Sequence, residues 1–280
     1  MKLVLFFLIF SPITFFSQLK ERLSFNDLEL MNLVGKVKNI EERVFEVNNK
    51  KLTFDNGILM PASFNYNFDE NGYVNYKEDI KKIDGKEKIS TKQYFTFEKN
   101  KPLTELYLIT EFADSDSIIY KYKYLNDSLI TKTNFSKSYK GLTERITISG
   151  NKEFSELSYP SEKVLESKTL EYNRNNKFVF KETIGFDDKE IIERKYKQNS
   201  NCTDFEKENI TENKFNINST QLREYDQLCN LVKITFINKN SKSDLKLEYK
   251  YDKIGNWIEK KSYNFAGRIY SITKRTITYY

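Results

Sequence analysis

The chain has 280 residues, of which 15% are aromatic and 31% are charged, and it carries a formal net charge of +6 with no histidine. The aromatic content excludes a disordered chain, and the charged content excludes a bundle of transmembrane helices. The absence of histidine excludes Ser-His-Asp and Cys-His catalysis and imidazole zinc sites, and the interspersed charges argue against a nucleic-acid partner.

Residues 1–17 have the parts of a secretory signal peptide. Lys2 precedes an apolar run from Leu3 to Phe16, and Ser17 follows it. The run is too short to cross a bilayer comfortably as a helix, and Pro12 interrupts it. We therefore expect export and cleavage after Ser17, giving a periplasmic or extracellular protein; an uncleaved anchor is the alternative.

The mature chain, residues 18–280, is expected to be a single domain, because no linker rich in Pro, Gly or Ser divides it. Its first part, residues 18–36, lacks the repeated motif described next. We expect a short helix there, acting as an N-terminal cap over an exposed sheet edge.

The remainder contains a repeated seven-residue frame: an aromatic residue, a polar turn that carries Asn, and an apolar residue six positions after the aromatic. Successive copies start 24 to 29 residues apart. Two copies are weaker: one begins with Ile148 in place of the aromatic residue, and another ends with Cys202 in place of the apolar residue. Because Asn and Gly tolerate positive φ, each copy predicts a turn between two strands. The eight copies are Phe68–Val74, Phe97–Leu103, Tyr124–Ile130, Ile148–Phe154, Tyr172–Phe178, Tyr196–Cys202, Tyr225–Leu231 and Tyr251–Trp257.

A second turn lies about halfway between copies. Phe178 to Ile184 and Glu190 to Tyr196 are expected to be strands, joined by a turn over Gly185 to Lys189. From Leu245 to Tyr251, apolar and charged residues alternate, which is typical of a strand with one wet face. We therefore predict an all-β fold: an antiparallel meander of hairpin repeats that forms a long, twisted or coiled sheet.

The segment Tyr251-Asp252-Lys253-Ile254-Gly255-Asn256-Trp257, followed by Gly267 and Arg268, resembles the YD-repeat, or rearrangement-hot-spot, family of exported bacterial proteins. Phe68-Asp69 and Tyr225-Asp226 match it less fully. The resemblance extends over most of the mature chain and is clearest in its last 30 residues. It implies a bacterial source and a long antiparallel sheet that coils on itself.

Candidate site residues are few. Tyr249, Tyr251, Trp257 and Tyr263 are candidates for an aromatic binding platform, with core packing as the alternative. Cys202 and Cys229 occupy turns of successive repeats, so they are candidates for a disulfide, with two buried thiols as the alternative. Acidic pairs such as Asp69-Glu70 fall at predicted turns, so we expect no catalytic pair, metal site or cofactor.

We therefore expect a non-enzymatic exported protein that offers an extended sheet surface for binding or structural roles at the cell envelope, with a glycan or envelope protein as partner. A carbohydrate-binding or carbohydrate-acting protein that uses surface aromatics and acids is the alternative. A membrane-spanning barrel is disfavoured, because Lys274 would face lipid near the middle of the final strand, at a cost of about 2 to 4 kcal/mol.

Overall fold

The computed structural model describes residues 19–46, 63–83, 86–98, 101–109, 116–136, 140–159, 164–185, 188–196, 205–214 and 217–280. The predicted signal peptide, residues 1–17, lies outside these ranges, and so does the Asn56-Gly57 pair, whose sequence predicts the turn of the first hairpin. Within them the chain is all-β apart from two short helices, α1 (Leu19–Ser24) and α2 (Asp27–Leu30).

The described residues form eighteen strands, joined in chain order by antiparallel pairing. Their bounds are β1 (Val37–Glu46), β2 (Ser63–Phe68), β3 (Val74–Ile83), β4 (Lys86–Glu98), β5 (Lys101–Ile109), β6 (Asp116–Asn126), β7 (Leu129–Ser136), β8 (Lys140–Ser149), β9 (Lys152–Ser158), β10 (Val164–Tyr172), β11 (Phe178–Ile184), β12 (Lys189–Lys195), β13 (Lys207–Glu212), β14 (Ile217–Tyr225), β15 (Leu231–Asn238), β16 (Ser241–Tyr251), β17 (Trp257–Tyr263) and β18 (Ile269–Tyr279).

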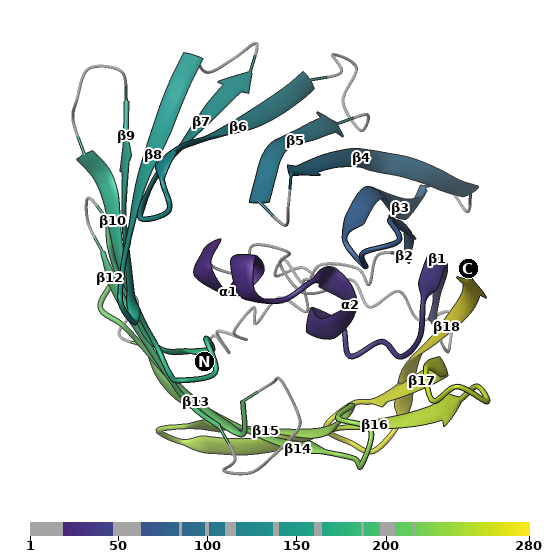
Figure 1. Cartoon of the computed structure of the whole chain (residues 1–280). Coiled ribbons are helices and arrows are strands. Elements are labelled where there is room, and N and C mark those ends of the chain that lie inside the picture. The colour runs from purple at the N-terminus through teal and green to yellow at the C-terminus, as the bar shows by residue number, and fades with distance from the viewer. Residues whose placement is uncertain are drawn as a thin grey trace.

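The sheet closes into a ring because the first strand pairs with the last as well as with its neighbour in the chain. β1 and β18 pair antiparallel from Val37 opposite Tyr279 to Glu46 opposite Ser271, with one register shift between Val37 and Asn39. On its other side β1 pairs with β2. Figure 1 shows β1 beside β18 and the strands arranged around the two helices. The expectation of an open, coiled sheet was therefore wrong, although the antiparallel meander itself is present.

Closure also removes the reason for a cap. An open sheet has two edges whose unpaired backbone groups need protection, and a closed barrel has none. The segment expected to contain a short helix contains two, and they lie inside the ring (Figure 1). The stretch from residue 153 to residue 170 has the weakest strand pattern in the sequence, yet its described residues, 153–159 and 164–170, lie almost entirely in β9 and β10.

The largest apolar cluster lies between α2 and the inner face of β1 to β4. Tyr66 and Phe68 are its largest fully buried side chains, and Leu28, Met31 and Leu33 from the helical segment pack against it. Burial of these large side chains from water is the main stabilising term at this end of the barrel. Its buried members are Val37, Ile40, Phe64, Tyr66, Phe68, Val74 and Phe95.

Candidate functional site

The inner face of the barrel carries many polar and charged side chains. Residues directly opposite each other on paired strands share a face of the sheet. Tyr122 lies opposite Lys132, which lies opposite Glu144, so all three side chains share the inner face with the buried Ile130 and Ile146. The lumen is therefore lined by charges as well as by apolar groups.

Ion pairs organise the charges of this inner face. The Arg194 Nε atom lies 2.7 Å from a Glu208 oxygen, and the side chain of Glu208 is 4% exposed. At the seam of the ring, Arg275 Nε lies 2.7 Å from Glu42, and both side chains are 9% exposed. The Arg275 guanidinium also lies 3.4 Å from the centre of the Trp257 ring. These buried charges are compensated by partners, as such charges must be.

The first helix lies against the inner wall at β6 to β10. Leu19 packs with Ile130 and Ile146. The backbone N–H of Lys20 donates to a Glu153 carboxylate oxygen at 2.9 Å, and the Tyr172 hydroxyl donates to the same atom at 2.9 Å. The helix is therefore anchored by a buried polar contact as well as by apolar packing.

The second helix is held at the opposite wall. Asn26 caps it: its side chain accepts from the backbone N–H of Glu29, whose carboxylate accepts from the N–H of Asn26 in return. Asp27 is 1% exposed, and its carboxylate accepts the backbone N–H of Val74 at 2.6 Å. The Leu28 N–H donates to the Gly72 carbonyl at 3.1 Å, so this helix is joined to the turn between β2 and β3.

The chain after the second helix crosses to the turns of the last strands. The Asn32 side chain donates to the carbonyl of Cys229 at 3.1 Å. Asn256 is 1% exposed; its side chain accepts from the Val34 N–H and donates to the Val34 carbonyl, both at 2.8 Å. Residues 19–36 are thus joined to several turns at one end of the barrel, and we call this segment the plug.

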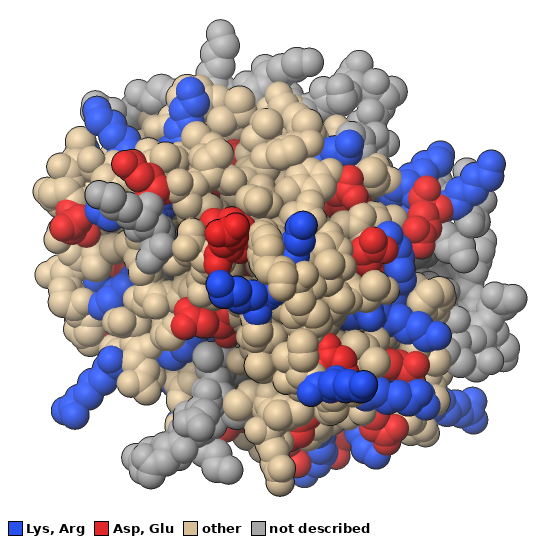
Figure 2. Space-filling view, turned by 45° about the vertical axis from the view of Figure 1, so that its right-hand side comes forward, with Lys and Arg blue, Asp and Glu red and all other residues tan. Residues whose placement is uncertain are grey.

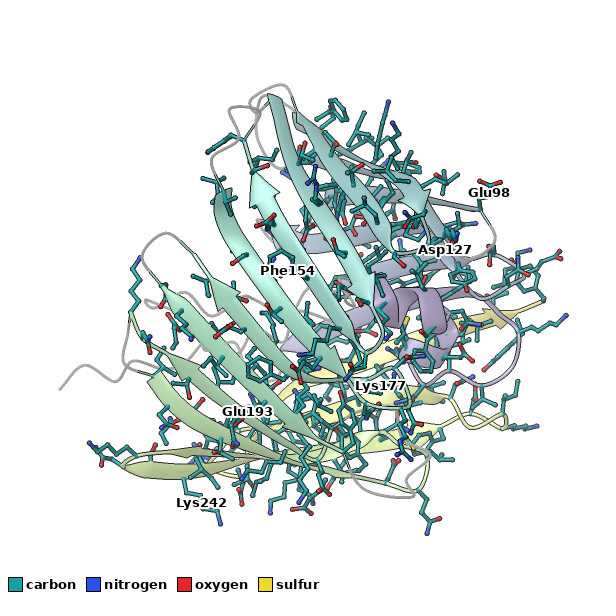
Figure 3. All side chains as sticks on the ribbon, turned by 60° about the vertical axis from the view of Figure 1, so that its left-hand side comes forward. Glu98, Asp127, Phe154, Lys177, Glu193 and Lys242 are labelled. Carbon is teal, nitrogen blue, oxygen red and sulfur yellow. The ribbon has the colours of Figure 1, made fainter. Side chains whose placement is uncertain are left out.

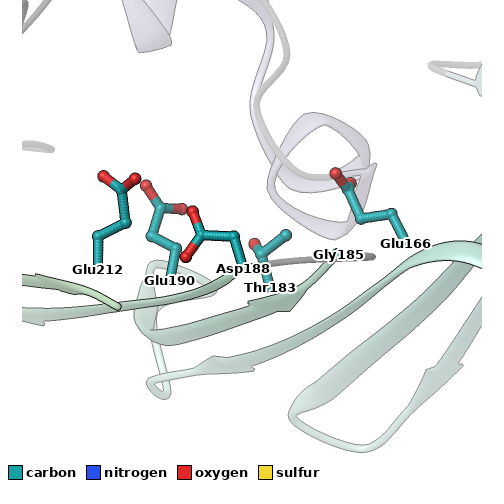
Figure 4. A pocket seen from close by; sticks show the side chains of 6 residues that line it. All are labelled: Glu166, Thr183, Gly185, Asp188, Glu190 and Glu212. Carbon is teal, nitrogen blue, oxygen red and sulfur yellow. The ribbon is translucent and has the colours of Figure 1, made fainter. Parts of the chain in front are cut away.

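Two cavities adjoin inner-wall side chains beyond the plug. The first, of about 290 Å³, is lined by Glu166, Thr183, Gly185, Asp188, Glu190 and Glu212, and Figure 4 shows their side chains. Its acids are largely engaged: Glu190 pairs with Lys181 at 2.8 Å, Glu166 pairs with Lys168 at 2.6 Å, and Asp188 accepts two backbone N–H groups. The second, of about 220 Å³, is lined by Tyr120, Lys132, Asn134, Leu142, Glu144 and Leu157.

The outer face carries charges of both signs, interspersed over the face in Figure 2. Along β16, the charged residues Asp244, Lys246, Glu248 and Lys250 point outward and are exposed, while Leu245 and Leu247 between them are buried. In Figure 3, Glu193 on β12 and Phe154 on β9 lie on the outside of the wall. Lys274 is exposed on the outer face too, with its ammonium 5.9 Å from the Phe45 ring centre.

The four predicted aromatic site residues do not form one platform. Tyr249 lies between Tyr251 and Trp257, with ring centres 6.1 and 5.8 Å apart, on the inner side of the wall. Trp257 is buried. Tyr263 lies on the outer side and donates its hydroxyl to Glu248 at 2.5 Å. The structure thus brings three of the four together, and whether any of them contacts a ligand stays a prediction.

The predicted disulfide also stays a prediction, because Cys202 lies outside the described residues. Cys229 occupies a turn position with a φ of 63°. The turn that the repeat predicts at this position is present in the structure.

The repeated turns depend on the Asp or Asn directly after the aromatic residue, a position whose residue the predicted frame does not specify. The Asp252 carboxylate accepts the backbone N–H groups of Ile254, Gly255 and Asn256, each at 2.9 Å. Its other oxygen accepts from the Tyr279 hydroxyl at 2.5 Å. Although burial acts to raise it, the pKa of Asp252 is lowered by these hydrogen bonds.

The same arrangement recurs in other turns, at both ends of the barrel. Asp69, Asn173, Asp226 and Asn264 each accept N–H groups two and four positions ahead. A residue with positive φ follows within each turn, as at Gly72 and Gly255. The Asp69-Glu70 pair is therefore a turn element, as its sequence position predicts.

Within the described ranges, no group of three acidic or cysteine side chains is placed to hold a metal ion. The described residues also include no helix long and apolar enough to cross a membrane.

Comparison with known proteins adds little. No protein-family model matches the chain, and no curated protein matches it. A solved structure described as a porin-like protein from Bacteroides vulgatus aligns over 87% of this chain and 98% of that one, at 11% identity and a TM-score of 0.29. At that TM-score we draw no functional argument from the alignment.

The geometry defines the chain as an antiparallel up-and-down β-barrel with a plugged, charged lumen. This corrects several expectations. The assignment to the YD-repeat family was wrong, since no family model matches and the sheet closes on itself. The extended open surface for a glycan or envelope protein was wrong, because the ring has no open sheet. The expectation of a periplasmic chain that does not span a membrane was wrong as well. The sheet closes, and a closed sheet leaves no backbone groups unpaired at an edge and is the form in which strands span membranes.

Proposed function

We propose that the chain is a porin-like β-barrel of the bacterial outer membrane, whose lumen takes up small polar solutes. The observation that supports the proposal is the closed ring of strands with charged side chains on its inner face. The proposed role involves no chemical reaction, in keeping with a non-enzymatic protein.

Closure matters for two reasons. A sheet in a bilayer must pair all its backbone groups internally, and only a closed barrel does so. A ring of this many strands also encloses more space than side chains alone fill, so barrels of this size class hold an aqueous lumen or a plug. Inner residues such as Lys132, Glu144 and Lys181 would then interact with solutes rather than with the membrane.

The plug determines the end of the barrel from which solutes can enter. Residues 19–36 contact the turns at one end of the barrel through Asp27, Leu28 and Val34. Solutes would enter from the opposite end, and passage through the barrel would require the plug to leave its contacts.

The charges on the outer face restrict which parts of the barrel can face lipid. A Lys side chain facing lipid at the bilayer midplane costs about 2 to 4 kcal/mol. The row of exposed charges along β16 crosses the length of that strand. In the proposed arrangement this strip faces water or another protein rather than acyl chains.

Cell fractionation combined with bilayer recording tests the proposal. We expect the full mature chain to sediment with outer membranes and to require detergent for extraction. Inserted in planar bilayers in KCl, it should give low or intermittent conductance while the plug is present, and higher conductance when residues 18–36 are deleted. Recovery of the full mature chain in a water-soluble periplasmic extract would refute the proposal.

A further inference from the structure

The smaller cavity, of about 220 Å³, is built on the inner wall from β6 to β9. Tyr120 lies opposite Asn134, Lys132 opposite Glu144, and Glu144 opposite Leu157, so these side chains share one face. The volume is below the range of pockets for drug-sized ligands, which is about 300 to 1,000 Å³. It suits a small molecule with one charged group.

Two acceptors at this cavity have no donor. The Asn134 Oδ1 atom is buried and accepts no hydrogen bond. Glu144 forms no hydrogen bond or ion pair with any residue in the described part of the chain, although ion pairs hold most other inner acids. A buried acceptor without a donor is costly, so the Asn134 oxygen favours a ligand that brings an N–H donor. The partly buried Glu144 carboxylate favours a ligand that brings a positive charge.

The net charge around the cavity also favours a cationic ligand. Lys132 is matched by Glu105, whose carboxylate lies 3.7 Å from the Lys132 ammonium and is 1% exposed. The ammonium also lies 4.5 Å from the centre of the Tyr120 ring. Glu144 is then the second negative charge against one positive charge, so the cluster of these three groups carries one net negative charge.

Apolar surface completes the cavity. Leu142 and Leu157 line it together with the Tyr120 ring. Leu19 of the plug packs on Ile130 and Ile146, which are the next inward residues along β7 and β8 from Lys132 and Glu144. The first helix therefore lies directly beside the cavity, on the side toward the plugged end.

We infer that this cavity binds a small organic cation: a primary ammonium group held by Glu144 and Asn134, with a short apolar or aromatic body against Leu142, Leu157 and Tyr120. The inference rests on the proposed function, because it names the class of solute that the lumen takes. A cation at Glu144 gains both a charge-assisted hydrogen bond and contact with an aromatic ring.

Calorimetric titration of the detergent-solubilised mature chain tests the inference, with three probes of similar shape: 2-phenylethylammonium, 3-phenylpropionate and 2-phenylethanol. We expect the ammonium to bind at least tenfold more tightly than the anion or the alcohol. Glu144→Gln should lower the affinity for the ammonium at least tenfold, and Asn134→Ala about threefold.

Glu156→Gln is the matched control, because Glu156 lies on the neighbouring strand and faces outward, opposite Arg145. It removes the same charge without touching the cavity, so affinity should not change. Circular dichroism identifies any variant that fails to fold, and in that case Glu144→Asp, which keeps the charge, should retain binding.

Equal binding of the ammonium and the anion, no binding of the ammonium, or an unchanged affinity in Glu144→Gln would each overturn the inference. The proposed function fails separately: a chain that conducts KCl but does not bind the ammonium refutes only the cation site. A chain that binds the ammonium but is found in the water-soluble periplasm refutes only the outer-membrane channel.

Discussion

The seam between β1 and β18 offers the sharpest test of the closed ring, because a buried ion pair crosses it. Glu42 and Arg275 are directly opposite in the register, 2.7 Å apart, and each side chain is 9% exposed. Arg275→Met removes the guanidinium and leaves the Glu42 carboxylate buried without its cation. Breaking one partner of such a pair costs about 3 to 5 kcal/mol, whereas replacing both partners is often close to neutral.

We therefore expect Arg275→Met to lower the free energy of unfolding by about 3 to 5 kcal/mol, and Glu42→Gln to recover much of this loss in the double variant. Urea unfolding followed by circular dichroism measures both, and a double-mutant cycle gives the coupling. Hydrogen exchange should show faster opening of β1 and β18 than of β6 to β9 in the single variant.

The chain contains a matched control. Lys246 and Glu248 form an ion pair on the outer face at 2.8 Å, but their side chains are 64% and 44% exposed. Exposed pairs contribute about 0.2 to 1 kcal/mol, so Lys246→Met should change stability little. If Arg275→Met were no more destabilising than Lys246→Met, the pair would not hold the seam and the reasoning would fail.

Three further outcomes are expected. Asp252→Ala should lower the free energy of unfolding by about 1 to 3 kcal/mol, because hydrogen bonds to a charged group are lost. Asp252→Asn should lower it less, because Asn173 accepts the equivalent hydrogen bonds in its own turn. Since the pKa of Asp252 is lowered in the folded protein, its contribution is fully present above the unfolded pKa of about 3.9 and is lost as pH falls through the folded value. The difference in free energy of unfolding between wild type and Asp252→Ala should therefore shrink as pH falls below the unfolded pKa, and a difference that stayed constant there would contradict the reasoning. Asp27→Ala leaves the buried Val74 N–H without an acceptor, so hydrogen exchange in residues 19–36 and bilayer conductance should both rise, with Asp27→Asn having the smaller effect; unchanged exchange would mean that other contacts hold the plug. Lys246→Cys should react with a membrane-impermeant maleimide in isolated outer membranes, while Leu247→Cys, at a buried position, should not, and protection of the first variant would place β16 against lipid.

Local patterns predict the strands and turns well. The alternation from Leu245 to Tyr251 and the turn at Gly185 correspond to β16 and to the β11–β12 connection. These features depend on neighbours in the chain, which any single sequence displays. The role of Asp252 is harder to predict, because Asn is the more frequent residue in the turns of the repeat, although an Asp directly after the aromatic residue recurs in three of the clearest copies.

Closure was not predictable in the same way. It depends on the pairing of β1 with β18, whose residues are separated by almost the whole mature chain and share no turn that fixes their register. Glu41, Glu42 and Arg43 are consecutive charged residues, and nothing in that local pattern indicates Arg275 as the partner of Glu42. The lumen cavity was missed for the same reason, since Asn134 and Glu144 become a pair of acceptors only when the inner face encloses them.

The pairing of the first strand with the last also constrains how the protein is made. β18 ends at Tyr279, so the ring cannot close until this strand has been synthesised. Until then the growing sheet has two unpaired edges, and exposed edges pair readily with other chains. Long-range pairing of this kind is also slow to form. A chain truncated within β18 would retain all its local hairpins and still be unable to complete the barrel, so its fate would be decided by chaperones and proteases.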